Sequence, residues 1–208
     1  MEIHAILQQA PVIPVLTLHD VDQALPLARA LLAGGLSVLE ITLRTPAGFE
    51  ALRRLAQDSE GWIAGAGTVT RPQEYEQVCA VGGAFAVSPG LPSDLASAVK
   101  DGPVPLLPGA MTPTEILQAR DLGFQTLKLF PAEQAGGTAF LRAIAAPIPD
   151  VTFCPTGGVS PANLQDYLAL PNVLCVGGSW VAPGQALAQG DWDSVTRLAT
   201  AACKTARG

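Results

Sequence analysis

The sequence predicts an α/β protein, a single-domain (β/α)8 or TIM barrel that spans residues 1–208. Three observations lead to this prediction. Short apolar runs recur along the chain, each run is followed by a stretch with helical spacing, and there are eight such units in 208 residues. Eight units give about 26 residues each, which is compact but sufficient for one barrel strand and its helix.

The eight apolar runs are the predicted strands. They are rich in Val, Leu and Ile, and each one closes on Gly, Pro or Thr. Because helices join consecutive strands, the strands should be parallel and buried on both faces, which explains why the runs are apolar throughout. In chain order they cover residues 12–17, 38–44, 62–68, 84–88, 104–107, 124–130, 151–156 and 173–177.

Three strands are predicted to pass into helices within a few residues, because a capping hydroxyl precedes a proline that can occupy the first helical position. Thr112 also has the spacing of a capping box with Glu115. Pro26 lies inside the helix that would otherwise begin at Asp20, and an interior proline costs about 3 kcal/mol, so we expect a kink or a later start there. The three hydroxyl–proline pairs are Thr45-Pro46, Thr112-Pro113 and Ser160-Pro161.

Composition and charge argue against several classes of function. The net charge of −6 and the lack of a long basic run do not favour a nucleic-acid partner. No segment approaches the roughly 18 uninterrupted apolar residues of a membrane span, and the first ten residues do not resemble a signal peptide. We therefore expect a cytoplasmic protein with no membrane partner.

Cysteine and histidine usage argues against a metal site. The four cysteines lie far apart among apolar neighbours and are predicted to be reduced, buried thiols. His4 and His19 are the two histidines, both near the N-terminus, so a multi-histidine metal site or a His-based triad at the barrel mouth is not indicated. No Gly-x-Gly-x-x-Gly follows a strand, and we predict neither a metal nor a nucleotide cofactor.

Lys128 is the first candidate for chemistry. Side chains alternate along the strand 124–130, so Lys128 should face the barrel interior while Leu127 and Leu129 face the helices. Burial favours the neutral amine, which is the form that attacks a ketone. The structural alternative is that this lysine extends out of one barrel end or forms a purely structural ion pair.

The second strand adds a carboxylate and a guanidinium to the same interior. Alternation over residues 38–44 points Glu40, Thr42 and Arg44 inward. Arg44 is nearest the C-terminal end of the strand, where the active sites of such barrels lie, and it suits a substrate carboxylate or phosphate. Glu40 lies deeper, within reach of Lys128. A structural Glu–Lys bridge remains the alternative to a catalytic pair.

Two glycine-rich strand exits predict a phosphate site. The seventh strand runs into Gly157 and Gly158, and the eighth ends on Gly177 and Gly178 before Ser179. Backbone N–H groups at such exits can approach an anion, and barrels of this class often bind phosphate after strands seven and eight. Tight turns also need glycine, so each pair alone is weak evidence. The stretch 65–68 is interpreted as a close-packed third strand that brings Thr68 to the mouth.

In seven segments the sequence resembles the 2-keto-3-deoxy-6-phosphogluconate (KDPG) aldolases of the Entner–Doudoroff pathway. The ordered set is specific and covers nearly the whole chain. The segments are PVIPV at 11–15, LEITLRT at 39–45, GAGTV at 65–69, SPG at 88–90, KLFPAE at 128–133, CPTGGVSPAN at 154–163 and VGGSW at 176–180.

The resemblance implies a class I aldolase, a lyase that forms a Schiff base on Lys128 and moves protons with Glu40. Its products would be pyruvate and D-glyceraldehyde 3-phosphate, and a homotrimer is the expected assembly. A hydroxyl at Thr156 is typical of gluconate-type rather than galactonate-type members, and unphosphorylated 4-hydroxy-2-oxoglutarate is a further plausible substrate of the family. The implied substrate contacts are Arg44, Thr68, Pro89, Phe130 and Thr156, and the implied phosphate contacts are Gly157, Gly158 and Ser179.

Other hypotheses keep the same barrel. A galactonate-type aldolase would share the lysine, the glutamate and the phosphate loops. A sugar-phosphate isomerase or epimerase could use Glu40 as a base without covalent chemistry, and a non-catalytic sugar-phosphate sensor would use Lys128 and Arg44 only as anion ligands. A metal-dependent aldolase would lose activity with a chelator.

Overall fold

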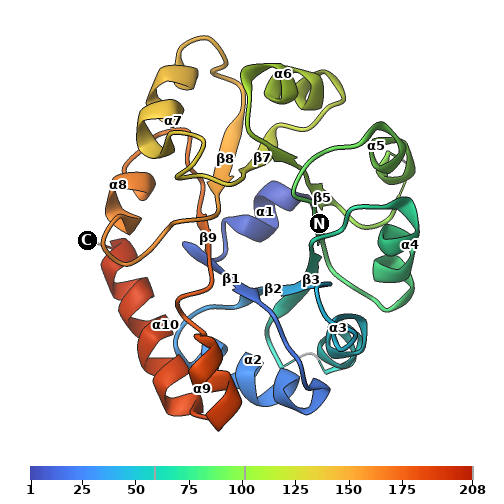
Figure 1. The fold of residues 1–208 in the computed structure, drawn as a ribbon, viewed down its shortest axis with the longest axis vertical. Coiled ribbons are helices and arrows are strands. Elements are labelled where there is room, and N and C mark those ends of the chain that lie inside the picture. The colour runs from blue at the N-terminus through green and yellow to red at the C-terminus, as the bar shows by residue number, and fades with distance from the viewer. Residues whose placement is uncertain (59, 101, 208) are drawn as a thin grey trace.

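Short parallel strands curl into a ring at the centre of the structure, and helices surround them (Figure 1). The computed structural model describes residues 1–58, 60–100 and 102–207. Residues 59, 101 and 208 of the predicted 1–208 domain lie outside the described residues. Within the described residues there are nine strands: β1 (Val12–Leu16), β2 (Val38–Thr42), β3 (Ile63–Gly67), β4 (Ala86–Val87), β5 (Leu106–Leu107), β6 (Gly109–Ala110), β7 (Thr126–Leu129), β8 (Thr152–Pro155) and β9 (Val176–Gly178).

The strands follow one another around the ring in chain order. One sheet has the order β5-β4-β3-β2-β1-β9 and the other has the order β6-β7-β8, with parallel pairing throughout. Isolated bridges between Phe153 and Val173 and between Thr156 and Gly177 connect the second sheet to the strand that closes the first. The sheets thus join into the predicted (β/α)8 barrel.

The fifth predicted strand, 104–107, was incomplete. The structure divides this part of the barrel into β5 and β6, which pair with β4 and β7 on either side. Pro108 separates them because it has no N–H to donate to a ladder, although its carbonyl accepts from the Lys128 N–H at 2.9 Å. The eighth predicted strand, 173–177, begins later, at Val176.

Helices cover the outside of the ring, and α1 lies across one of its ends (Figure 1). Helix α1 is held there by His4, whose Nδ1 is 3.2 Å from Oγ1 of Thr126 on β7. The helices are α1 (Ile3–Leu7), the 3-10 helix η1 (Val21–Gln23), α2 (Ala24–Ala33), α3 (Gly48–Gln57), α4 (Pro72–Ala80), α5 (Ser93–Val99), α6 (Pro113–Asp121), α7 (Gly137–Ala145), α8 (Leu164–Leu168), α9 (Gly184–Gln189) and α10 (Trp192–Arg207).

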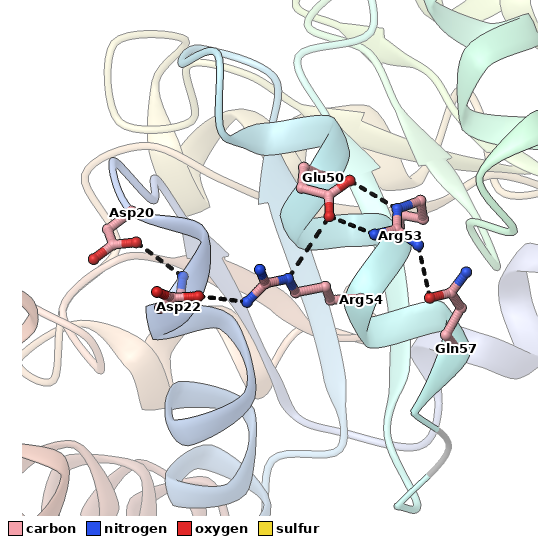
Figure 2. Close-up of polar contacts among 6 residues, drawn as sticks. All are labelled: Asp20, Asp22, Glu50, Arg53, Arg54 and Gln57. Carbon is pink, nitrogen blue, oxygen red and sulfur yellow. Dashed lines mark hydrogen bonds and ion pairs between the residues drawn. The ribbon is translucent and has the colours of Figure 1, made fainter.

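The predicted late start at Pro26 is confirmed. Asp20 caps η1 by accepting from the Asp22 N–H at 2.9 Å, and α2 begins only at Ala24. Pro26 therefore lies in the first turn of α2, where its missing N–H has no intrahelical partner to lose. Figure 2 shows that Arg54 of α3 donates to Asp22, with Nη1 2.6 Å from Oδ1. This contact joins η1 to the neighbouring helix.

One of the three predicted helix starts is confirmed. Thr112 caps α6, Pro113 is its first residue, and the Glu115 side chain completes the capping box.

The other two helix starts were wrong. Helix α3 begins at Gly48 rather than at Pro46, because the Thr45 hydroxyl donates to the Leu18 carbonyl and leaves the chain in a turn. Helix α8 begins at Leu164 rather than at Pro161, because the Asn163 side chain accepts the Ser160 N–H and forms a turn first. In both places a tertiary or side-chain contact takes the position that the local pattern assigned to a helix cap.

The cysteines are free thiols, as predicted, but Cys79 is only half-buried. None of the helices in the described part of the chain combines the length and the apolar composition that a membrane span requires. No group of three or more histidine, cysteine or acidic side chains that could hold a metal ion is found in the same part of the chain.

Candidate active site

Lys128 and Glu40 meet inside the barrel. Lys128 is on β7 and Glu40 on β2, which are not neighbouring strands, and Lys128 Nζ lies 3.2 Å from Glu40 Oε1. Their side chains are only 5% and 3% exposed. The inward orientation predicted for both residues is thus confirmed. An amine beside a carboxylate, both shielded from water, has the composition needed to form an imine with a ketone.

Gly67 makes room for this pair. It is in register with Thr42 on the neighbouring strand, and a Cβ at Gly67 would lie 2.2 Å from Glu40 Oε1. Any larger residue would therefore displace the carboxylate. The third strand is close-packed as predicted, but its role beside Glu40 was missed, because the partner of a strand glycine depends on register.

Arg44 and Thr68 lie together where β2 and β3 end. Arg44 Nε donates to Thr68 Oγ1 at 3.0 Å, and the guanidinium is exposed to solvent. Thr68 has a φ of 65°, and among the described residues it is the one non-glycine with positive φ. Such strained backbone persists where the surrounding structure holds it, and it is concentrated at functional sites. The structure therefore places a fixed hydroxyl next to an exposed cation where these two strands end.

A pair of hydroxyl groups was missed by sequence reasoning. Thr17 follows β1, and its Oγ1 lies 2.8 Å from that of Thr42 on β2. The register of Val15 with Glu40 carries Thr17 to the level of Thr42 on the same face of the sheet. The alternation of side chains along the strand places Val15 and Thr17 on one face. The contact with Thr42 could not be predicted without the register between the two strands.

Phe130 and Pro89 lie at the same end of the barrel. Lys128 Nζ is 5.3 Å from the centroid of the Phe130 ring, which is a cation–π distance. Pro89 is exposed and packs its carbonyl against β6, since a Cβ at Gly109 would lie 2.2 Å from the Pro89 oxygen. Gly109 is in register with Lys128, so Pro89 stands beside the lysine-bearing strand.

The two glycine-rich exits are adjacent in space. Thr156 is buried and bridges to Gly177, where a Cβ would lie 2.2 Å from Thr156 Oγ1. Gly157 and Gly158 have φ values of 99° and 82°, in the left-handed region that favours glycine. The predicted proximity of the exits is therefore confirmed.

Ser179 opens onto a small cavity at this end. The cavity has a volume of about 370 Å³, and Thr17, His19 and Gln23 line it together with Ser179. His19, one of the two histidines near the N-terminus, is exposed.

Two thiols also face the interior. Cys154 is in register with Lys128 and is buried. A hydrogen bond with Cys154, burial, and the nearby charge of Glu40 raise the pKa of the Cys175 thiol well above its ordinary value. Cys175 therefore stays protonated at neutral pH. These thiols were predicted as core residues, and their position beside the ion pair was missed.

Comparison with known proteins identifies relatives of this chain. The model of the family described as KDPG and KHG aldolase matches residues 3–198. The 2-dehydro-3-deoxy-phosphogluconate aldolase of Dickeya dadantii is 50% identical over 194 residues, which cover 93% of this chain and 91% of that protein. The KHG/KDPG aldolase of Escherichia coli K12 is 48% identical over 203 residues, which cover 98% of this chain and 95% of that protein.

A solved structure shares the fold. It is the KDPG aldolase of Legionella pneumophila with pyruvate captured at low pH as a covalent carbinolamine intermediate. It superposes with a TM-score of 0.94 at 43% identity, and the match covers 96% of this chain and 97% of the other.

Proposed function

This chain belongs to the KDPG and KHG aldolase family, and we propose that it is a class I aldolase, a lyase that cleaves KDPG to pyruvate and D-glyceraldehyde 3-phosphate. The single observation that carries the proposal is the buried contact of Lys128 Nζ with Glu40 Oε1 at 3.2 Å. A Schiff-base mechanism requires an amine and a proton-transfer group at one carbon atom, and this contact supplies both.

Lys128 is proposed as the nucleophile. Its neutral amine adds to the C2 ketone, and loss of water gives an iminium. The positive nitrogen accepts the electron pair of the C3–C4 bond as that bond breaks, which yields an enamine on the lysine and the aldehyde of glyceraldehyde 3-phosphate.

Glu40 is proposed as the general acid and base. It assists proton transfer when the carbinolamine forms and loses water, and it removes the C4 hydroxyl proton during cleavage. It then returns a proton to C3 of the enamine, and hydrolysis of the iminium releases pyruvate and restores the amine. Gly67 supports this role because it leaves the space that the Glu40 carboxylate occupies.

Arg44 and Thr68 are proposed to hold the pyruvate end of the substrate, with Arg44 on the carboxylate. Pro89, Phe130 and Thr156 would shape the space around the reacting carbons. The backbone at Gly157 and Gly158, together with Ser179, would bind the phosphate away from the bond that breaks. Their common position at the strand exits supports this assignment.

The gluconate configuration is the proposed substrate preference. It is supported by the hydroxyl at Thr156 and by the names of the relatives from Dickeya dadantii and Escherichia coli. The second of these names also supports a side activity on 4-hydroxy-2-oxoglutarate (KHG). Such a substrate has no phosphate, so its cleavage would not use the glycine loops.

We further propose that residues 1–208 act as one domain, that the protein forms a homotrimer and that it works in the cytoplasm. The trimer is proposed from the resemblance to the family. Nucleic acids and membranes are not proposed as partners, and no metal or other cofactor takes part in the proposed mechanism.

The decisive experiment is borohydride reduction with and without pyruvate, followed by intact-protein and peptide mass spectrometry. We expect a stable adduct on the peptide that contains Lys128, and none in Lys128→Arg, which keeps the charge but removes the nucleophile. Lys204→Arg, an exposed position on α10, is the matched control and should form the adduct. If pyruvate binds and no adduct forms, an isomerase, an epimerase or a sensor takes the place of the aldolase.

A further inference from the structure

In the loop after β8, the carbonyl groups accept hydrogen bonds from a backbone N–H and a side-chain amide outside the loop's two glycines. The Glu133 N–H donates to the Gly157 carbonyl at 3.1 Å, and Asn163 Nδ2 donates to the Gly158 carbonyl at 3.1 Å. Within the described part of the chain, the N–H groups of Gly157 and Gly158 donate to no protein acceptor. The contacts therefore hold the carbonyls on one side and leave the N–H groups for an anion.

Asn163 fixes both parts of this loop with one amide. Its Oδ1 accepts the Ser160 N–H at 2.8 Å, while its Nδ2 bonds the Gly158 carbonyl. The same Nδ2 lies 3.4 Å from Glu133 Oε1. Asn163, whose side chain displaces the helix start predicted at Pro161, therefore also holds the loop in place.

Glu133 connects the loop to the strand that carries Lys128. The segment after β7 lies alongside the loop and is joined to it by two successive backbone hydrogen bonds. The Ala132 N–H donates to the Thr156 carbonyl at 2.9 Å, and the Glu133 N–H donates to the Gly157 carbonyl. A Cβ at Gly158 would lie 2.2 Å from Glu133 Cγ, so the loop is packed directly on this side chain.

A hydrogen bond from Tyr167 fixes the Glu133 carboxylate. The side chain of this tyrosine is fully buried on α8, and its hydroxyl donates to Glu133 Oε1. Burial, this hydrogen bond and the charge of Glu133 raise the pKa of Tyr167, so the phenol stays protonated and remains a donor. A carboxylate beside a phosphate site would repel the anion, but here it is engaged by the hydroxyl and the amide.

We propose that Glu133, Tyr167 and Asn163 are positioning residues for the phosphate of the substrate. They hold the Gly157–Gly158 backbone with its N–H groups toward the anion, and they do not take part in the covalent chemistry at Lys128. This inference rests on the proposed aldolase function. It predicts that the three residues determine the affinity for phosphorylated substrate and leave the reaction with pyruvate unchanged.

The test compares two readouts in the full-length protein. KM and kcat are measured for KDPG, and the exchange of pyruvate methyl protons in D2O is followed by NMR, since this exchange needs the enamine but no phosphate. In Tyr167→Phe, Asn163→Ala and Glu133→Ala we expect KM to rise about tenfold, which corresponds to about 1.4 kcal/mol of binding free energy. We expect kcat and pyruvate exchange to stay within about twofold.

Two further variants separate positioning from general damage. Tyr75→Phe is the matched control, because Tyr75 is also buried and its hydroxyl donates to the Val104 carbonyl at 2.7 Å, away from the loop. Its KM should not change. Glu133→Gln should restore a KM near that of the wild type, because glutamine can still accept from Tyr167.

Each outcome has a definite meaning. An unchanged KM in all three variants, or an equal loss of pyruvate exchange and KDPG cleavage, would overturn the inference. If Tyr167→Phe does not fold, Asn163→Ala still tests it, since Asn163 is only half-buried. A wild-type protein that neither exchanges pyruvate protons nor forms a borohydride adduct would refute the aldolase function itself, and the inference with it.

Discussion

The amine of Lys128 and the carboxylate of Glu40 are two charges held almost entirely out of water, 3.2 Å apart. Burying such a pair costs solvation that its mutual attraction only partly offsets, so it contributes little to the reason why the barrel folds. Removing one partner is different, because the other then stays buried without compensation, at a cost of about 3–5 kcal/mol. Because the pair contributes little to folding, its presence inside the barrel is better explained by a chemical role.

The first prediction concerns Glu40→Gln. We expect kcat for KDPG cleavage to fall by about 10²–10⁴-fold, since proton transfer is lost, and the free energy of unfolding to fall by a few kcal/mol, about the cost of an unpaired buried amine. Steady-state kinetics and urea unfolding measure the two effects. Glu60→Gln, which removes an exposed pair with Arg29, should change stability by at most about 1 kcal/mol. A Glu40→Gln enzyme with near-normal kcat would refute the acid–base role.

The second prediction concerns Gly67→Ala. The added Cβ would lie 2.2 Å from Glu40 Oε1, so the carboxylate must move and its contact with Lys128 must lengthen. Displacement of a catalytic group by about 1 Å can cost a hundredfold in rate, and we expect a kcat loss of that order. Gly184→Ala, where a Cβ would meet nothing within 4 Å, is the control. Equal kcat in the two variants would show that the space beside Glu40 is not needed.

Among the elements, α6 shows how local sequence determines a helix end. Thr112 caps the helix, and the Glu115 carboxylate accepts from the N–H groups of Met111 and Thr112, each at 2.8 Å. These bonds, first of all the one from Met111, hold the pKa of Glu115 below its ordinary value of 4.5 despite partial burial. Because the folded-state pKa is the lower one, the ionised carboxylate stabilises the folded protein above pH 4.5, and this stabilisation is lost as the pH falls through the folded-state pKa.

The third prediction follows from that sign. Glu115→Gln should lower the free energy of unfolding at pH 7 by about 0.5–2 kcal/mol, as loss of a helix-capping interaction does. The difference from the wild type should shrink as the pH falls from 4.5 toward 3, because the wild-type carboxylate takes up its proton more readily in the unfolded than in the folded protein. Urea unfolding at both pH values measures this. Glu76→Gln, an exposed position on α4, is the control, and a Glu115 effect that grew toward pH 3 would contradict the assignment.

At the scale of the whole molecule, the barrel brings together groups from the exits of several strands. The buried amine and carboxylate lie inside, and the exposed groups of Arg44, Pro89 and Ser179 surround them at the mouth. This division suits a substrate whose reacting carbons enter a dry interior while its phosphate stays near solvent.

The fourth prediction belongs to this scale and concerns metals. The proposed electron sink is the iminium on Lys128, so we expect KDPG cleavage to be unchanged after dialysis against EDTA. Activity is compared before and after dialysis, and again after Mg²⁺ or Zn²⁺ is added. Loss of activity that a metal restores would favour a metal-dependent aldolase over the Schiff base.

The sequence by itself determined the alternation of strands and helices, and the inward face of the two strands predicted at 38–44 and 124–130. These are properties of period and composition, and they placed Lys128, Glu40 and the two glycine-rich exits correctly. Local capping chemistry also determined the start of α6, because all the groups involved lie within a few residues of one another.

Only the tertiary structure decided which of these groups touch. Lys128 and Glu40 are 88 residues apart, Thr17 and Thr42 are 25 apart, and Glu133 and Tyr167 are 34 apart. Their contacts depend on how strands pair and how the ring closes, which no local pattern encodes. For the same reason the helix start predicted at Pro46 was wrong, whereas the start predicted at Pro161 was wrong because the nearby Asn163 side chain accepts the Ser160 N–H. The Thr45 hydroxyl, which could cap a helix in isolation, instead binds the distant Leu18 carbonyl once folding brings it within reach.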